Sequence, residues 1–222
     1  MGDFDEITVD EEKIVRAIRM GVPLVMTTYT LPKKVEKYIE KVVTLFLEHI
    51  RQLPLRDNII YCIQELVVNA KKANTKRVYF TERGLDLSNP EDYMRGMESF
   101  REDTLNNIDY YLELQRQHGL YVKLILQLKS DIITMEVRNN STIAVEELRR
   151  IRARIQKARK FDDIEEAMIQ LLDDSEGAGL GLLILVVMMK KLGLQDDSFD
   201  ILRTNQETIA RIVIPKALKK NI

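Results

Sequence analysis

The sequence predicts a single domain, spanning residues 1–222, in which α-helices and β-strands are mixed. Three observations support this prediction. Several segments carry apolar residues at the helical period, and shorter runs rich in β-branched residues have the character of strands. Hydrophobic residues make up 45% of the 222-residue chain, which is enough for a sizeable core.

The chain begins with a predicted strand and a predicted helix. Residues 22–30 (VPLVMTTYT) are rich in β-branched side chains, and Pro23 favours an edge position in a sheet. Leu31 and Pro32 then open a helix, because proline suits the first helical turn. The apolar residues of this segment recur at the helical period as far as Ile50.

A second helix is expected to begin at Asp57, which is a good N-cap residue. At 100° per residue, Glu65, Asn69 and Lys72 fall within an arc of about 60°. The opposite face is an apolar stripe of Ile59, Ile63, Leu66 and Ala70. This arrangement is typical of an ordinary amphipathic helix with a solvated polar face. It also sets a carboxylate, an amide and an ammonium group in register, as a site for phosphate and Mg²⁺ would need.

In the middle of the chain, the sequence pattern predicts a strand followed by a helical insertion. Residues 76–82 (KRVYFTE) are predicted to be the strand. Asn89-Pro90 is a strong signal for the start of a helix or pair of helices that runs toward Gln117. Residues 84–119 are therefore assigned to the insertion. Its apolar side chains either pack on the parent domain or form a surface for a homodimer or another partner.

Two hairpins complete the predicted sheet. Residues 120–128 and 132–138 form the first hairpin, which turns over Lys129-Ser130-Asp131. Residues 199–203 and 208–215 form the second, which closes the sheet.

A charged segment and a glycine motif lie between the two hairpins. Residues 142–176 are predicted to be helical, and their basic residues form either a solvated helix face or a phosphate contact. Gly177, Gly179 and Gly181 then precede the apolar run 182–189, for which Gly193 is the expected C-cap. A glycine loop that opens into a buried helix presents N–H groups and a positive dipole end to an anion. No Gly-Lys-Ser/Thr follows, so this is not a Walker loop.

The two polar motifs together resemble one family of nucleotide-binding proteins. The pattern E-L-x-x-N-A-x-K-A at residues 65–73, followed by G-x-G-L-G-L at residues 177–182, resembles the GHKL superfamily of histidine kinase-like ATPases. Its nearest members are the ATP-binding domains of anti-sigma-factor serine kinases and of histidine kinases. The resemblance covers roughly residues 27–215. It implies the Bergerat fold, a two-layer α/β sandwich with a mixed, mostly antiparallel sheet and helices on one face.

The resemblance also implies roles for particular residues. Glu65 would be the catalytic carboxylate that orients or deprotonates the nucleophile, Asn69 would ligate Mg²⁺, and Lys72 would approach the phosphates of ATP. Residues 142–176 would be the lid over the nucleotide. The positions that would line the nucleotide also include Ala73, Gly177, Gly179, Leu180 and Gly181.

One position departs from the family pattern. Where the family has Asp-x-Gly-x-Gly and its aspartate accepts a hydrogen bond from the adenine amino group, this chain has Asn139 and Ser141. An asparagine oxygen still accepts such a bond, but it is a neutral and weaker acceptor. Two functions therefore remain open. The chain is a stand-alone protein kinase or regulatory ATPase that acts on a partner protein in signalling, or it is a degenerate binding module with weak or no affinity for nucleotide.

The composition excludes several other classes of protein. The 34 basic and 35 acidic residues nearly balance, which argues against a general role in binding nucleic acid. Cys62 is the single cysteine, so it supports neither a disulfide framework nor a cysteine metal cluster, and we expect a buried thiol. The first residues are acidic, and no apolar run approaches the roughly 20 residues of a membrane span. The expected location is the cytoplasm.

Overall fold

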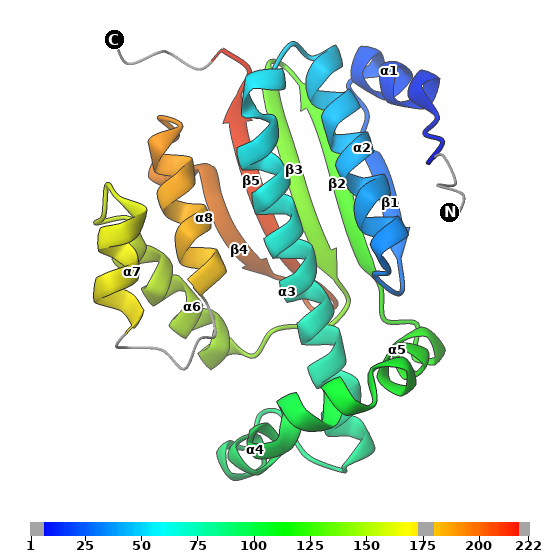
Figure 1. Cartoon of the computed structure of the whole chain (residues 1–222), viewed down its shortest axis with the longest axis vertical. Helices are drawn as coiled ribbons and strands as arrows, with labels where there is room; N and C mark the ends of the chain where they lie inside the picture. Colours follow the sequence, from blue (N-terminus) through cyan, green and yellow to red (C-terminus); the bar gives the residue numbers. More distant parts are fainter. Residues whose placement is uncertain (1–6, 173–179, 218–222) are drawn as a thin grey trace, which may run out of the picture.

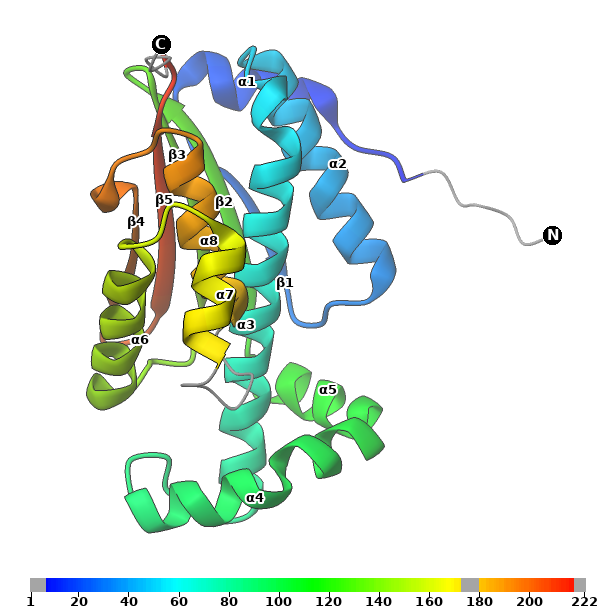
Figure 2. The ribbon, with the colours of Figure 1, turned by 60° about the vertical axis from the view of Figure 1, so that its left-hand side comes forward.

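A computed structural model describes residues 7–172 and 180–217 of the chain. A five-stranded sheet has helices packed on one of its faces, and a pair of helices lies beyond one end of the sheet (Figures 1 and 2). The predicted α+β sandwich with helices on one face of a sheet is therefore confirmed. The sheet was predicted to be mixed and mostly antiparallel, but its five described strands are antiparallel throughout.

The sheet contains both predicted hairpins and the predicted edge strand. In spatial order the strands are β1 (Leu24–Thr28), β2 (Val122–Lys129), β3 (Ile132–Asn139), β5 (Thr208–Pro215) and β4 (Phe199–Arg203). All neighbouring strands run antiparallel. Proline has no backbone N–H to donate to a neighbouring strand, so Pro23 is tolerated next to the edge strand β1.

Three helices cover the inner face of the sheet. These are α2 (Lys33–His49), α3 (Arg56–Glu82) and α8 (Leu180–Lys191), and α3 lies in the middle (Figure 1). The short helix α1 (Glu11–Met20) packs against α2 near one end of the sheet. The 3₁₀ turns η1 and η2 span Leu53–Leu55 and Asp196–Ser198. The helix that was expected to begin at Asp57 begins one residue earlier, and Asp57 lies in its first turn.

The charged segment between the hairpins is helical, as predicted. It forms α6 (Val145–Ala158) and α7 (Ile164–Leu172), which both pack against α8 on the side away from α3. Ile155 and Ala158 of α6 are buried in that contact. These two helices therefore form part of the hydrophobic core, in addition to flanking the glycine motif.

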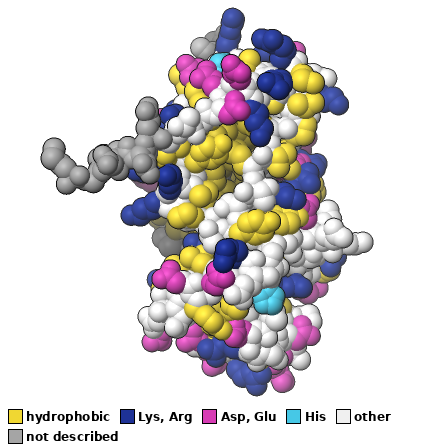
Figure 3. All heavy atoms as spheres, turned by 90° about the vertical axis from the view of Figure 1, so that its right-hand side faces the viewer, with side chains coloured by type: hydrophobic (Ala, Val, Ile, Leu, Met, Phe, Trp, Pro, Cys, Tyr) yellow, Lys and Arg dark blue, Asp and Glu magenta, His cyan; other side chains and the backbone are white. Residues whose placement is uncertain are grey.

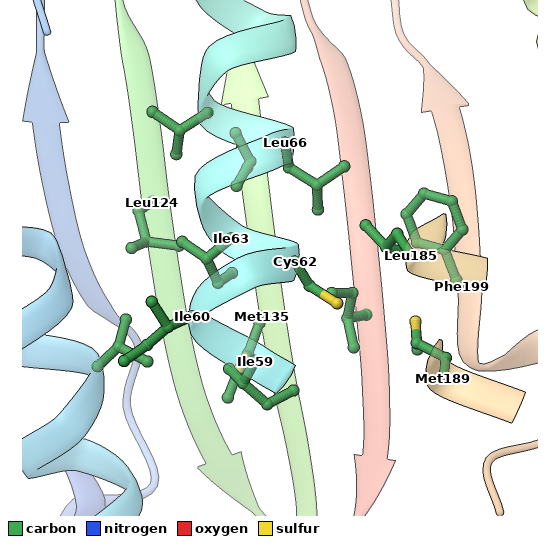
Figure 4. Packing of buried hydrophobic residues seen from close by; sticks show 14 of the residues in the cluster. Ile59, Ile60, Cys62, Ile63, Leu66, Leu124, Met135, Leu185, Met189 and Phe199 are labelled. Atoms are coloured by element: carbon green, nitrogen blue, oxygen red, sulfur yellow. The ribbon is translucent and has the colours of Figure 1, made fainter. Parts of the chain in front are cut away.

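The main core lies between the helices and the sheet. The predicted apolar stripe of α3 is confirmed, because Ile59, Ile63, Leu66 and Ala70 are all buried. Figure 4 shows side chains of this stripe facing Leu124 and Met135 of the sheet, with Leu185 of α8 and Phe199 of β4 beside them. Burial of this apolar surface is the main source of stability for the layered arrangement.

Cys62 projects from α3 into this core and is fully buried. Burial raises the pKa of its thiol to about 12. Because only the thiolate reacts, we expect native protein at pH 8 to resist a thiol reagent such as DTNB until the chain unfolds. The raised pKa also means that the thiol favours the folded state below an unfolded pKa near 9, and that this contribution disappears as the pH rises from 9 toward 12. Rapid labelling of the native protein would contradict the burial of Cys62.

The predicted strand at residues 76–82 is wrong, because α3 continues as one helix to Glu82. The segment contains Val78, Tyr79 and Phe80, which have the β-branched and aromatic character of a strand. All three are buried, at exposed fractions of 3% or less, although consecutive helical residues point in different directions. They are buried because other helices pack around this end of α3. Tertiary packing here overrides local propensity.

The helices around that end are α4 (Pro90–Asn106) and α5 (Ile108–Gln117), which confirms the helical nature of the segment after residue 84. Asn89 caps α4 by accepting hydrogen bonds from the backbone N–H groups of Glu91 and Asp92. A second, separate hydrophobic cluster forms there. Tyr79 lies at its centre, with ring centroids 5.2 Å from Phe100 and 5.7 Å from Tyr111.

The contacts of Tyr79 join the three helices. Its hydroxyl donates a hydrogen bond to Asp103 of α4 at 2.8 Å. That hydrogen bond, together with the nearby Arg83 guanidinium, lowers the pKa of Asp103. Most apolar residues of the insertion pack on α3. This agrees with the interpretation that the insertion packs on the parent domain. Met94, Leu105, Ile108 and Tyr110 remain exposed.

Candidate functional site

The two motifs that are far apart in the sequence meet where α3 and α8 cross. Glu65 lies near the middle of α3, and Gly181 lies in the first turn of α8. A Cβ atom built on Gly181 would lie 2.1 Å from Cδ of Glu65 and within 2.4 Å of both carboxylate oxygens. Because glycine has no Cβ, the carboxylate can lie directly against the backbone of α8.

Asn69 lies one turn further along α3 and fixes the Glu65 carboxylate. Its Nδ2 donates a hydrogen bond to Oε1 of Glu65 at 2.8 Å. A carboxylate can only accept, so the nitrogen of the amide must face Glu65 and Oδ1 of Asn69 must face elsewhere. An amide oxygen is a suitable ligand for Mg²⁺. Both side chains are half-buried, which leaves them within reach of a ligand.

The N-terminus of α8 adds a partial positive charge at this place. The first N–H groups of a helix have no partner inside the helix, and the helix dipole places its positive end there. The predicted site residues Leu180 and Gly181 belong to this turn and are half-buried. Gly177 and Gly179 lie outside the described residues. A carboxylate, an amide oxygen and a helix N-terminus therefore occupy one location.

Asn139 lies at the end of β3 and is almost fully buried, with 3% of its surface exposed. Its Nδ2 donates to Oδ1 of Asn74 and to the backbone oxygen of Ser141, both at 3.2 Å. Asn74, on α3, in turn donates from its own Nδ2 to the backbone oxygen of Tyr121 at 3.0 Å. The structure thus joins Asn139 to α3 through a chain of buried hydrogen bonds.

Sequence reasoning missed Asn74. A signal was present, because Asn74 follows Ala70 by one turn and so continues the apolar stripe of α3 with a polar residue. A buried amide on such a stripe needs hydrogen-bond partners. Its position indicated an internal polar contact, but the partner on β3 could not be identified without the fold.

Two lysines of α3 differ in their surroundings. Lys72, predicted to approach phosphate, is exposed, and its neighbour Ala73 is half-buried. Lys76, one turn further on, was not singled out from the sequence. Its Nζ pairs with Glu147 of α6 at 2.7 Å and lies 5.4 Å from the ring centroid of Tyr93. Lys76 therefore connects α3 to the start of α6.

Most of the basic residues of α6 are exposed, as the solvated-face interpretation held. Two basic side chains, one in α6 and one at its C-cap, also bind the protein. Arg152 donates to the backbone oxygen of Ile201 at 2.9 Å, and Arg159 donates to that of Phe199 at 3.1 Å. Both carbonyls belong to the edge strand β4. The acidic residues Asp162 and Asp163 pair with Lys190 and Lys191 at the C-terminal end of α8, the end opposite Gly181. The hydrogen bond from Lys191 lowers the pKa of Asp163.

Within residues 7–172 and 180–217, no helix is both long and apolar enough to cross a membrane. In the same part of the chain, no group of three or more His, Cys, Asp or Glu side chains is arranged to hold a metal ion. Asn69 could still bind a cation in another way. Its amide oxygen and the neighbouring carboxylate would supply only a few ligands, and a bound molecule or water would supply the rest.

Comparisons with known proteins give one informative relative. The chain is 47% identical over 214 residues to an uncharacterized protein of Treponema pallidum (strain Nichols). The similarity covers 96% of this chain but 42% of that protein, so the chain spans less than half the length of its relative. No family model and no solved structure matches the chain.

Proposed function

We propose that this chain is an ATP-binding domain of the GHKL type, with the Bergerat fold, that acts in signalling as a protein kinase or regulatory ATPase on a partner protein. The observation that carries the proposal is the contact between Glu65 and Gly181. The two residues belong to separate motifs, about a hundred residues apart, and the residue pattern of each motif suits a nucleotide site. Their contact brings both motifs to the N-terminus of α8, and a helix N-terminus suits an anionic ligand.

The residues present fit a nucleotide with its Mg²⁺ ion. Asn69 has its amide nitrogen bound to Glu65, so its oxygen faces away from Glu65 and is able to ligate the ion. The N-terminus of α8 would receive phosphate oxygens through its N–H groups, and exposed Lys72 is long enough to add a positive charge. When bound, the ion would neutralise charge that develops on the phosphates.

Glu65 is the residue with the chemical capacity to act on a nucleophile. Its carboxylate is half-buried, accepts a hydrogen bond from Asn69 and lies against the first turn of α8. From that position it would orient an attacking water or hydroxyl group and accept its proton. Phosphoryl transfer depends mainly on such positioning and on charge neutralisation, so one well-placed carboxylate is sufficient.

The test is a calorimetric titration with a non-hydrolysable ATP analogue, with and without Mg²⁺. We expect wild-type protein to bind the analogue in a Mg²⁺-dependent manner and Asn69→Ala to lose that dependence. Gln64→Ala is the matched control, because Gln64 is an exposed amide on the same helix. Glu65→Ala is expected to retain binding and to lose turnover. Absence of binding to the folded wild-type protein would refute the proposal.

A second function is supported by a different observation. Exposed apolar side chains occur on the insertion, where Met94 and Leu105 are more than 60% exposed. They also occur in β1, where Val25 is 44% exposed, and just after it, where Tyr29 is 48% exposed. Figure 3 shows hydrophobic side chains gathered on the β1 side of the molecule. Such surfaces often bind other proteins. A binding module that does not use nucleotide would show partner binding that Glu65→Ala and Asn69→Ala leave unchanged.

A further inference from the structure

We propose that two copies of this chain associate through the edge strand β1, which pairs antiparallel with β1 of the second copy. The interface lies on the sheet and not on the helical insertion. It goes beyond the proposed function, because it does not depend on nucleotide binding. The inference follows from a difference between the two edge strands of the sheet, β4 and β1.

The edge at β4 is closed by side chains. Arg159 donates a hydrogen bond to the backbone oxygen of Phe199 at 3.1 Å. Arg152 donates to the backbone oxygen of Ile201 at 2.9 Å. The backbone N–H of Ile201 donates to Oδ1 of Asp200 at 2.8 Å. These bonds occupy outward backbone groups of β4, so another strand cannot pair along this edge without breaking them.

The edge at β1 is open. Lys129 and Ile132 close a two-residue turn, so they exchange hydrogen bonds across β2 and β3. Counting from this pair, the even-numbered residues of β1 bond to β2, and Val25 and Thr27 direct their N–H and C=O groups outward. Within residues 7–172 and 180–217, no strand or side chain bonds to these outward groups.

The open edge also lacks the charges that commonly keep edge strands apart. The five residues of β1, LVMTT, are all uncharged. Val25 is 44% exposed, and Tyr29, just beyond the strand, is 48% exposed. Figure 3 shows hydrophobic side chains gathered on this side of the molecule. An unprotected edge of this kind favours pairing with a further strand.

A second copy of β1 is complementary to this edge. With Met26 opposite Met26 of the second copy, Val25 of each copy lies opposite Thr27 of the other. Each of these two pairs exchanges both N–H···O bonds. The resulting four hydrogen bonds use every outward group of Val25 and Thr27 in both copies. The opposed side chains are β-branched and uncharged, which suits adjacent strands.

The closed edge limits the assembly to two copies. Pairing of β1 with β1 has two-fold symmetry, so it uses the open edge of both copies at once. The edges that remain are the two β4 strands, which Arg152 and Arg159 close. The net charge of the chain is only −1, so long-range repulsion between copies is weak. We therefore expect a dimer with one continuous sheet and no growth into fibres.

The experiment measures the dissociation constant of the dimer by sedimentation equilibrium of the full chain. Thr27→Pro removes an N–H group that the single copy does not use, so the fold should tolerate it. Each dimer would lose two of its four hydrogen bonds, and we expect the dissociation constant to rise about tenfold or more. Thr27→Val is the matched control. It keeps the N–H and the β-branched shape, and it should change the dissociation constant by about threefold or less.

A single cysteine tests the register of the pairing. Met26→Cys would set two thiols opposite each other, where Cα atoms lie about 4.5 Å apart and a disulfide between copies can form. Oxidised glutathione is the oxidant, and a non-reducing gel should show a band of doubled mass. Thr28→Cys is the control, because residue 28 is on the same face but would lie about 14 Å along the strand from its counterpart. Cys62 is buried in both variants.

Three results would overturn the inference while leaving the proposed function intact. The first is wild-type protein that stays monomeric up to about 1 mM. The second is a dimer that a folded Thr27→Pro protein forms as tightly as the wild type. The third is a dimeric Met26→Cys protein that forms no disulfide. If Thr27→Pro fails to fold, Val25→Lys replaces it, because an exposed position accepts lysine and a charge on an edge strand opposes pairing.

Discussion

Replacing Gly181 by alanine is expected to reduce turnover of ATP by about 100-fold or more while leaving the protein folded. The added methyl group would lie 2.1–2.4 Å from the Glu65 carboxyl group, so that group must leave its place and lose its hydrogen bond from Asn69. The displaced atoms are the end of a flexible side chain, and alanine is the better helix former. We therefore expect the free energy of unfolding to change by only about 1 kcal/mol.

A double-mutant cycle checks the cause of this effect. Glu65→Ala should lose turnover to a similar extent, and adding Gly181→Ala to it should cause little further loss, because the carboxylate is already absent. Steady-state turnover and thermal unfolding of all four proteins provide the measurement. If the two substitutions have independent effects on turnover, the contact between Glu65 and Gly181 does not position the carboxylate.

Replacing Asn139 by aspartate, the residue that the family pattern has at this position, is expected to destabilise the protein by about 3 kcal/mol and to weaken nucleotide binding. The new carboxylate would face Oδ1 of Asn74 and the backbone oxygen of Ser141, and it could not donate to either. It would also lie in an almost fully buried place.

Asn140→Asp is the comparison for this substitution, because Asn140 is the neighbouring residue and is only half-buried. Denaturant unfolding of the two variants should show a clearly larger loss of stability for Asn139→Asp. A variant with aspartate at position 139 that is as stable as the wild type and binds ATP more tightly would show that Asn74 adapts, and that its orientation is not fixed by Tyr121.

The strands and most helices could be predicted because their signals are local. The hairpin of β4 and β5 was predicted with its observed bounds, since alternation and turn residues specify it. The end of α3 could not be predicted. Val78, Tyr79 and Phe80 form a run without helical periodicity, and their burial depends on α4 and α5, which come later in the chain. A residue whose neighbours on several sides come from other elements loses the periodic pattern that reveals a helix.

In the candidate site, too, contacts within one helix could be predicted and contacts between distant segments could not. Glu65 and Asn69 were predicted as neighbours on one helix face, and their hydrogen bond agrees with that spacing. The contact of Glu65 with Gly181 was expected only from the resemblance to a family. Asn74 and Lys76 were missed because their partners, Asn139 and Glu147, are remote in sequence. Hydrogen bonds between distant segments leave no periodic trace in a single sequence.

The length of α3 has a consequence for how the molecule opens. The helix has 27 residues, or about 40 Å, and its two ends belong to two separate hydrophobic clusters. The amides of residues 76–82 are protected only as long as α4 and α5 stay docked, whereas those near Cys62 are protected by the main core. Native-state hydrogen exchange should therefore divide this one helix into two cooperative units of unequal stability. The boundary between them would fall near Asn74, so that local unfolding of the insertion would loosen the hydrogen bond between Asn74 and Asn139 before the contact between Glu65 and Gly181.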